Sequence, residues 1–214
     1  MGKANQGVFG AWTKRVGNVV GRVIQGVNVY SIYQPNVSNP RTEAQQGQRA
    51  QFTLLTQFFS TMTAFLRTSW KSLDGYKHGS AFSSAVGWNL KNGAVTGNYP
   101  NYSLAMNKVK VSDGNIALPF NAGATSESGT LNFTWADNTG RGDALATDEV
   151  MVLVYNPTTR ESIFSTRIAV RSERVAELVC PTAWSGNQVH VYLAMQREST
   201  GECSDSTYIG DFVL

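Results

Sequence analysis

The chain has 214 residues, of which 42% are hydrophobic and 11% aromatic, so it can bury a core and is not disordered throughout. Its net charge of +3 comes from 18 basic and 15 acidic residues, and no apolar run reaches the ~18 residues of a membrane-spanning helix. The two cysteines, Cys180 and Cys203, are too few for a disulfide framework, and we expect both thiols to be reduced.

The charge is distributed unevenly along the chain. Residues 1–77 contain nine basic and two acidic residues, a net charge of +7, whereas residues 78–214 contain nine basic and thirteen acidic residues, a net charge of −4. The first acidic side chain is Glu43. This asymmetry predicts a basic N-terminal segment attached to a mildly acidic body. Such a segment either contacts nucleic acid or an acidic partner, or is simply solvated.

Residues 1–38 are predicted to form a basic, glycine-rich arm. Within residues 17–35, valine and isoleucine between the glycines favour one or two strands, with Gly21 and Gly26 at bulges or close backbone approaches. An arm of this kind typically completes the sheet of another protein. Its glycines interrupt every apolar stretch, which predicts that no secretory signal peptide is present. The side chains expected to make the arm's contacts are Trp12, Lys14, Arg15 and Arg22.

Residues 39–101 are predicted to form a helical region with one long amphipathic helix from about 43 to 72. Thr42 and Gln45 have the spacing of a capping box, and large apolar residues then recur at steps of three and four. A stripe of that length exceeds what a small sandwich can cover, so we expect it to contact other subunits. The residues of this predicted helical interface are Phe52, Leu55, Phe59, Met62, Phe65 and Trp70. A shorter helix is expected to end at Asn92-Gly93.

Residues 102–214 are predicted to form an antiparallel β-sandwich of the immunoglobulin or fibronectin kind. Short strands separated by turns follow one another, beginning with the alternating segment Met106–Val111. The segment Glu149–Tyr155 is apolar almost throughout, which is typical of a central strand. Trp135 and Tyr192 are the expected core residues of the sandwich. The fold class is therefore α+β, with arm, helix and sandwich in that order.

The sequence contains no arrangement that predicts catalysis, a metal site or a cofactor. His78 and His190 lie far apart without neighbouring ligands, and no serine has the context of a nucleophile elbow. Arg141-Gly142-Asp143 matches the integrin-binding tripeptide, but three residues recur by chance and a polar loop is the simpler interpretation. We therefore do not expect an enzyme.

Three segments resemble an uncharacterised family of about 200 residues from Bacteroidota and their phages. They are Arg15–Arg22, Asn39–Phe52 (NPRTEAQQGQRAQF) and Val150–Ser165, and the NPRTEAQ motif is the most specific. The resemblance covers nearly the whole chain and implies no activity, cofactor or catalytic residue. It does imply an association with phages.

Together these observations lead to one expected function and two alternatives. The expectation is a structural or assembly protein, specifically a phage virion component located in the virion or the host cytoplasm, with a homo-oligomer or other particle proteins as partners. The first alternative is an exported adhesion module that binds carbohydrate or protein. The second is an accessory protein that binds nucleic acid through residues 1–22.

Overall fold

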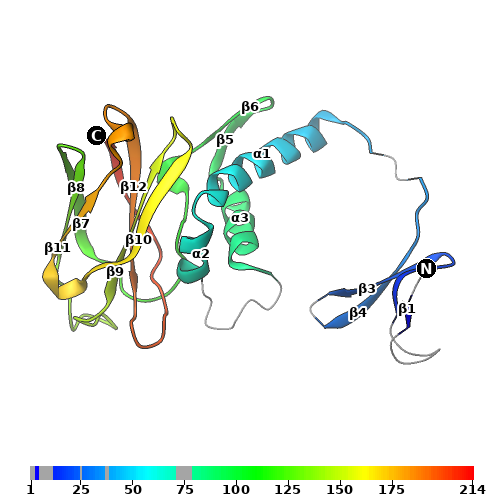
Figure 1. Ribbon diagram of the computed structural model, residues 1–214, viewed down its shortest axis with the longest axis horizontal. Coiled ribbons are helices and arrows are strands. Elements are labelled where there is room, and N and C mark those ends of the chain that lie inside the picture. The colour runs from blue at the N-terminus through cyan, green and yellow to red at the C-terminus, as the bar shows by residue number, and fades with distance from the viewer. Residues whose placement is uncertain (1–2, 5–11, 25, 37–38, 71–78) are drawn as a thin grey trace. The chain divides into compact units, whose positions relative to one another are not determined.

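The computed structural model describes residues 3–4, 12–24, 26–36, 39–70 and 79–214. The chain divides into two compact units, Met1–Arg41 and Thr42–Leu214 (Figure 1). The described residues contain three α-helices and several antiparallel sheets, so the predicted α+β class is confirmed.

The first unit is a four-stranded antiparallel sheet, which we call the arm sheet, with the strand order β1-β2-β3-β4. The chain reverses at Gly17 and Gly26, whose φ angles of 58° and 79° lie in the left-handed region that glycine adopts without strain. Residues 17–35, predicted to form one or two strands, form two, and two further strands precede them. The strands are β1 (Lys3–Ala4), β2 (Trp12–Val16), β3 (Val19–Ile24) and β4 (Val27–Ile32).

The second unit has three layers. Helices cover one face of a four-stranded sheet of order β10-β9-β12-β13, and a three-stranded sheet of order β11-β8-β7 covers its other face (Figure 1). The hairpin β5–β6 packs beside α1. The helices are α1 (Glu43–Ser60), α2 (Thr63–Ser69) and α3 (Ala81–Lys91). The strands are β5 (Val95–Asn98), β6 (Asn101–Leu104), β7 (Phe120–Glu127), β8 (Thr130–Ala136), β9 (Glu149–Asn156), β10 (Glu161–Val170), β11 (Val175–Val179), β12 (Gln188–Gln196) and β13 (Thr207–Val213).

The three layers enclose two hydrophobic cores, and β9 contributes to both. Val150, Val152 and Val154 face the three-stranded sheet, while Met151 and Leu153 face the helices. Every residue of β9 is buried, which explains why the run is apolar in both alternating sets. The helical region and the sandwich therefore share a core within one compact unit.

The long helix predicted from about 43 to 72 is two helices, so that prediction is wrong. α1 ends at Ser60, and Met62, with φ −126° and ψ 27°, separates it from α2. The hydroxyl groups of Ser60, Thr61 and Thr63 donate to backbone carbonyls three residues earlier, a pattern that bends helices. The Thr61 carbonyl accepts a hydrogen bond from Ser162 of β10 at 2.8 Å, which fixes the bend against the sheet. Residues 71 and 72 lie outside the described residues.

The segment Met106–Val111, predicted as the first strand of the sandwich, is not a strand. It forms a short 3-10 turn, Met106–Lys108, followed by extended chain, and the strands of the sandwich begin at Phe120. Side chains satisfy its backbone: Asn89 accepts from the Lys110 N–H and Ser206 accepts from the Val111 N–H. The sequence alternates here because Val109 and Val111 are buried in the core beneath the helices, whereas the lysines next to them are not.

The two thiols are expected to react only slowly while the protein is folded. Cys180 lies in the core between the sheets and Cys203 in the core beneath the helices, so the four-stranded sheet separates them. Burial raises the pKa of Cys180 to about 11, which leaves little thiolate near neutral pH. Mass spectrometry after alkylation without reductant should find both thiols blocked in denaturant and nearly unmodified in buffer. A product lacking two hydrogens, with neither thiol blocked, would contradict the reduced state.

Candidate functional site

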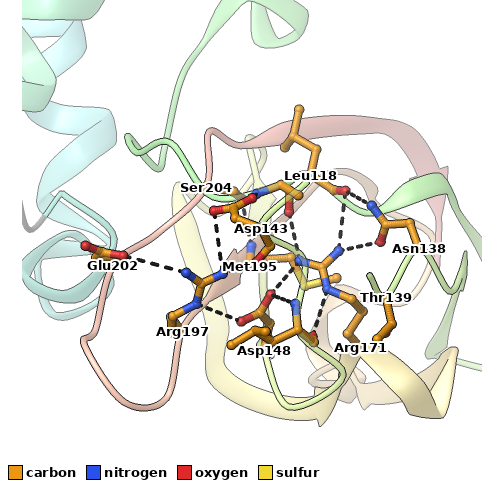
Figure 2. A network of polar contacts seen from close by, with 12 residues as sticks. Leu118, Asn138, Thr139, Asp143, Asp148, Arg171, Met195, Arg197, Glu202 and Ser204 are labelled. Carbon is orange, nitrogen blue, oxygen red and sulfur yellow. Dashed lines mark hydrogen bonds and ion pairs between the residues drawn. The ribbon is translucent and has the colours of Figure 1, made fainter. Parts of the chain in front are cut away.

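A buried arginine organises one end of the sandwich. Arg171 follows β10 in the short 3-10 turn Arg171–Glu173, and its side chain is 0% exposed. Each of the five N–H groups of its guanidinium has an acceptor (Figure 2). Nε donates to the Leu145 carbonyl (3.2 Å), Nη1 to the Leu118 carbonyl (3.4 Å) and to Asn138 Oδ1 (2.6 Å), and Nη2 to the Ala117 carbonyl (2.8 Å) and to Asp148 Oδ2 (2.9 Å).

Asp148 is the anionic partner of Arg171 and is also 0% exposed. Its Oδ2 accepts from the Leu145 N–H at 2.9 Å, and its Oδ1 lies 3.3 Å from Nε of a second arginine, Arg197. Arg197 pairs further with Asp143 at 3.5 Å and with Glu202 at 3.9 Å, and it donates to the Asp143 carbonyl (Figure 2). The charges therefore alternate from the interior towards the surface.

This network holds two loops and the end of β10 together. Arg171, at the end of β10, joins the chain before β7 to the β8–β9 loop, since its acceptors come from both of these segments. Because every guanidinium N–H of Arg171 has an acceptor, the arrangement stabilises this end of the sandwich. Asp143 of the Arg-Gly-Asp tripeptide is engaged as well: it accepts from the Ala117 N–H at 3.0 Å.

This network was not predicted from the sequence. The signal was present in the hairpin: Asp148 directly precedes β9 and Arg171 directly follows β10. β9 and β10 pair antiparallel with Glu149 opposite Val170, so the two charged residues meet at the same end. A residue immediately before one strand and another immediately after its hairpin partner are neighbours in space.

Two open grooves lie elsewhere on the second unit. One, of about 340 Å³, lies where the α1–α2 bend meets the β9–β10 turn and is lined by Thr61, Arg160, Glu161, Ser162, Ile163, Pro181 and Trp184. The other, of about 660 Å³, lies between α1 and the β5–β6 hairpin and is lined by Glu43, Ala44, Gly47, Gln48, Gln51, Asn98, Tyr99 and Tyr102. Neither lining pairs a nucleophile with a histidine base.

The described residues also contain no group of three or more His, Cys, Asp or Glu that could hold a metal ion. None of the helices in the described ranges is long and apolar enough to cross a membrane. His190 lies in β12, where its Nδ1 is 2.9 Å from the Tyr208 hydroxyl, and burial lowers its pKa. That histidine is a half-buried sheet residue with a tyrosine partner.

The arm sheet is the other candidate, because it exposes apolar side chains on both faces. One face, which we call the basic face, combines arginine with aliphatic side chains on neighbouring strands. Its members are Arg15, Val20, Arg22, Ile24, Val27, Val29 and Ser31. Arg15 also lies 3.7 Å from the centroid of the Tyr33 ring and donates to the Gly17 carbonyl.

The second face of the arm sheet is aromatic and aliphatic. Trp12 and Tyr30 lie with ring centroids 4.4 Å apart. The Trp12 backbone passes so close to Gly21 that a Cβ there would be 2.1 Å from the Trp12 carbonyl oxygen. The close backbone approach expected at Gly21 is therefore observed. Lys14, the remaining predicted contact residue of the arm, has a φ of 72° and is exposed.

The helical residues predicted as an interface lie mostly in the chain's own core. Five of the six are 0–4% exposed and pack beneath the helices: Leu55, Phe59, Met62, Phe65 and Trp70. Their assignment to contacts with another subunit is therefore wrong, because the outer face of the four-stranded sheet already covers them. Phe52 differs, at 52% exposed.

The two predicted core residues occupy different layers. Trp135 is 4% exposed and lies between the two sheets. Tyr192 is 1% exposed but faces the helices, where its hydroxyl donates to the Met106 carbonyl at 2.8 Å. Burial raises the pKa of Tyr192 well above its usual value.

Comparison with known proteins identifies a family and one distant structural likeness. The model of DUF6266, a family of unknown function, matches residues 10–210. Curated proteins gave no match. Among solved structures, the solution structure of the fn3 domain of human collagen alpha-1(XX) chain is similar to 48% of this chain and 87% of that chain, with 16% identity and a TM-score of 0.31.

Proposed function

The chain belongs to the DUF6266 family of unknown function, and we propose that it is a non-enzymatic structural protein built into a larger assembly through its arm sheet. One observation carries the proposal: the arm sheet exposes apolar side chains on both faces. Strand β4 illustrates this, because Val27 and Val29 point to the basic face while Tyr30 and Ile32 point to the other. All four are 39–79% exposed.

Such a sheet is costly to leave in water. Apolar surface contributes about 25 cal/mol per Å² when it is buried, and contiguous exposed patches of it mark interaction sites. A sheet of a few short strands is marginal unless one face packs against another layer. We infer that a partner supplies that layer. The exposed apolar residues of the arm sheet are Val16, Val23, Ile24, Val27, Val29, Tyr30 and Ile32.

The geometry of the second unit supports a non-enzymatic role. Its buried charges are satisfied by one another, and most of its apolar helical residues belong to its own core. Within this proposal the specific particle we favour is a phage virion, because the sequence resembles a family from Bacteroidota and their phages. A virion component would act in the particle or in the host cytoplasm.

Deleting residues 1–38 should abolish assembly and leave the second unit folded. The deletion removes the arm and retains Thr42, whose hydroxyl accepts from the Gln45 N–H at the start of α1. Light scattering over a range of concentrations should show an assembly for the full chain and a monomer for the deletion variant, with matching circular dichroism of the sandwich.

A matched pair of variants separates the arm from general surface effects. Ile24→Ser with Val27→Ser removes two apolar groups from the arm and should weaken assembly, whereas Val213→Ser, at a site 64% exposed on β13, should not. A full-length protein that is a monomer at every concentration, unchanged by the deletion, would refute the proposal. Steeply salt-dependent DNA binding by such a monomer would favour the nucleic-acid alternative.

A further inference from the structure

The outer face of the three-stranded sheet is a second exposed sheet surface. In β8, Leu131, Phe133 and Trp135 point into the core, so the alternate residues of the strand point outward. The strand pairing then defines the members of this face, which we call the acidic face. They are Phe120, Gly123, Thr125 and Glu127 of β7, Thr130, Asn132, Thr134 and Ala136 of β8, and Val175, Glu177 and Val179 of β11.

This face combines apolar and acidic side chains. Phe120, Val175 and Val179 are 52%, 60% and 75% exposed. Glu127 and Glu177 are both exposed, and the three strands contain no lysine or arginine. Helices cover the corresponding outer face of the four-stranded sheet, but no described element of the second unit covers this one.

The basic face of the arm sheet is its complement. It has two arginines among aliphatic side chains, where the acidic face has two glutamates among aliphatic and aromatic side chains. Residues 1–42 contain no acidic residue at all. Packing the two sheets face to face would join apolar groups to apolar groups and opposite charges to each other, at the usual sheet separation of about 10 Å.

We propose that the basic face of the arm sheet of one copy packs on the acidic face of a second copy. This inference rests on the proposed assembly function and names the surface that receives the arm. In Figure 1 the C-terminal end of α1 lies near the sheets and its N-terminal end lies away from them. The buried apolar residues of α1, Leu55, Phe58 and Phe59, lie near its C-terminal end. To reach the acidic face of its own copy, the chain that precedes α1 would therefore have to run back along most of α1 and past both sheets.

The length of the connection favours a second copy as the donor of the arm. The ten residues 33–42 span at most ~35 Å when fully extended. The 18 residues of α1 alone account for ~27 Å. Each further layer adds about 10 Å, so the connection falls short of the chain's own acidic face.

Reciprocal exchange also provides the area that a stable pair needs. Strand spacing and rise give each three-stranded face a footprint of about 300 Å². When two copies exchange arms, four such faces are buried, about 1,200 Å² together, which reaches the lower limit of stable interfaces. A single contact between one arm and one acidic face would bury half of this area and would not reach that limit. The expected product is a closed dimer.

Charge reversal tests the pairing. Glu127→Lys with Glu177→Lys makes the receiving face basic, and Arg15→Glu with Arg22→Glu makes the arm acidic. Each double variant alone should associate about tenfold or more weakly, because like charges then face each other. Mixing the two should restore dimers, since each arm then meets a face of opposite charge. The matched control, Glu198→Lys with Asp211→Lys, makes the same change in charge on exposed sites away from the face and should leave association unchanged.

The outcomes separate this inference from the proposed function. Arm-dependent assembly that withstands reversal at Glu127 and Glu177 would overturn the inference and leave the proposed function standing, because the arm would then bind elsewhere. A mixture that stays monomeric would also overturn it. A wild-type monomer unaffected by arm deletion would overturn both. Binding of a DNA duplex that is lost on reversal at Arg15 and Arg22, with protein association unaffected, would assign the arm to nucleic acid and overturn the inference.

Discussion

Replacing Arg171 with methionine should lower the free energy of unfolding by about 3–5 kcal/mol, the range observed when one partner of a buried ion pair is removed. Asp148, 0% exposed, would keep Arg197 at 3.3 Å as its cationic partner but lose the 2.9 Å contact to Arg171. The Ala117 carbonyl and Asn138 Oδ1 would lose their donor, whereas the Leu118 and Leu145 carbonyls would keep Asn138 Nδ2 and the Asp148 N–H. Unpaired buried acceptors add to the loss. Denaturant unfolding followed by circular dichroism measures the effect.

Arg197→Met is the matched control for that substitution. Arg197 contacts the same carboxylate of Asp148, but its side chain is 15% exposed and its other partners lie near the surface. We expect a loss of about 1 kcal/mol, as for partly solvated pairs. Combining Arg171→Met with Asp148→Leu should cost less than the sum of the single changes, because removing both charges leaves neither unpaired. Equal losses for Arg171→Met and Arg197→Met would show that burial does not govern the network.

The sandwich could be predicted from local patterns. Leu131, Phe133 and Trp135 alternate with polar residues, and this period of two identifies a strand with one buried face. The apolar run of β9 indicated a central strand, and its burial on both faces confirms that prediction. The same run contained a further signal: if both alternating sets are apolar, a second layer must cover the sheet. The helices are that layer.

What could not be predicted depends on contacts between distant segments. The bend between α1 and α2 is held by Ser162 of β10, about a hundred residues later, and periodicity alone continued the helix through it. The apolar stripe of α1 and α2 gave no indication of whether its partner is the same chain or another. The partner is the same chain, because Met151, Leu153 and Tyr192 on the outer face of the four-stranded sheet pack against the stripe. The network of Arg171 likewise requires the register of β9 and β10.

Replacing Trp135 with alanine should destabilise the protein by about 3–5 kcal/mol, the usual cost of removing a buried aromatic side chain. Its ring lies between the two sheets at 4% exposure, among residues that include Leu131, Phe133 and Val150. Its indole Nε1 also donates to the carbonyl of Arg171 at 2.7 Å, so the substitution affects the turn that positions the buried guanidinium.

Trp135→Phe separates the two contributions of the indole. Phenylalanine retains most of the apolar contact but cannot donate to the Arg171 carbonyl, and an unpaired buried acceptor costs about 1–3 kcal/mol. If the hydrogen bond supports the turn, Trp135→Phe and Arg171→Met should together cost less than the sum of their separate losses, because residues in one network do not act additively. Chemical denaturation of the four proteins completes this cycle. A loss below about 1 kcal/mol for Trp135→Ala would mean that the sheets close over the missing ring, and additive losses in the cycle would mean that Trp135 only fills space.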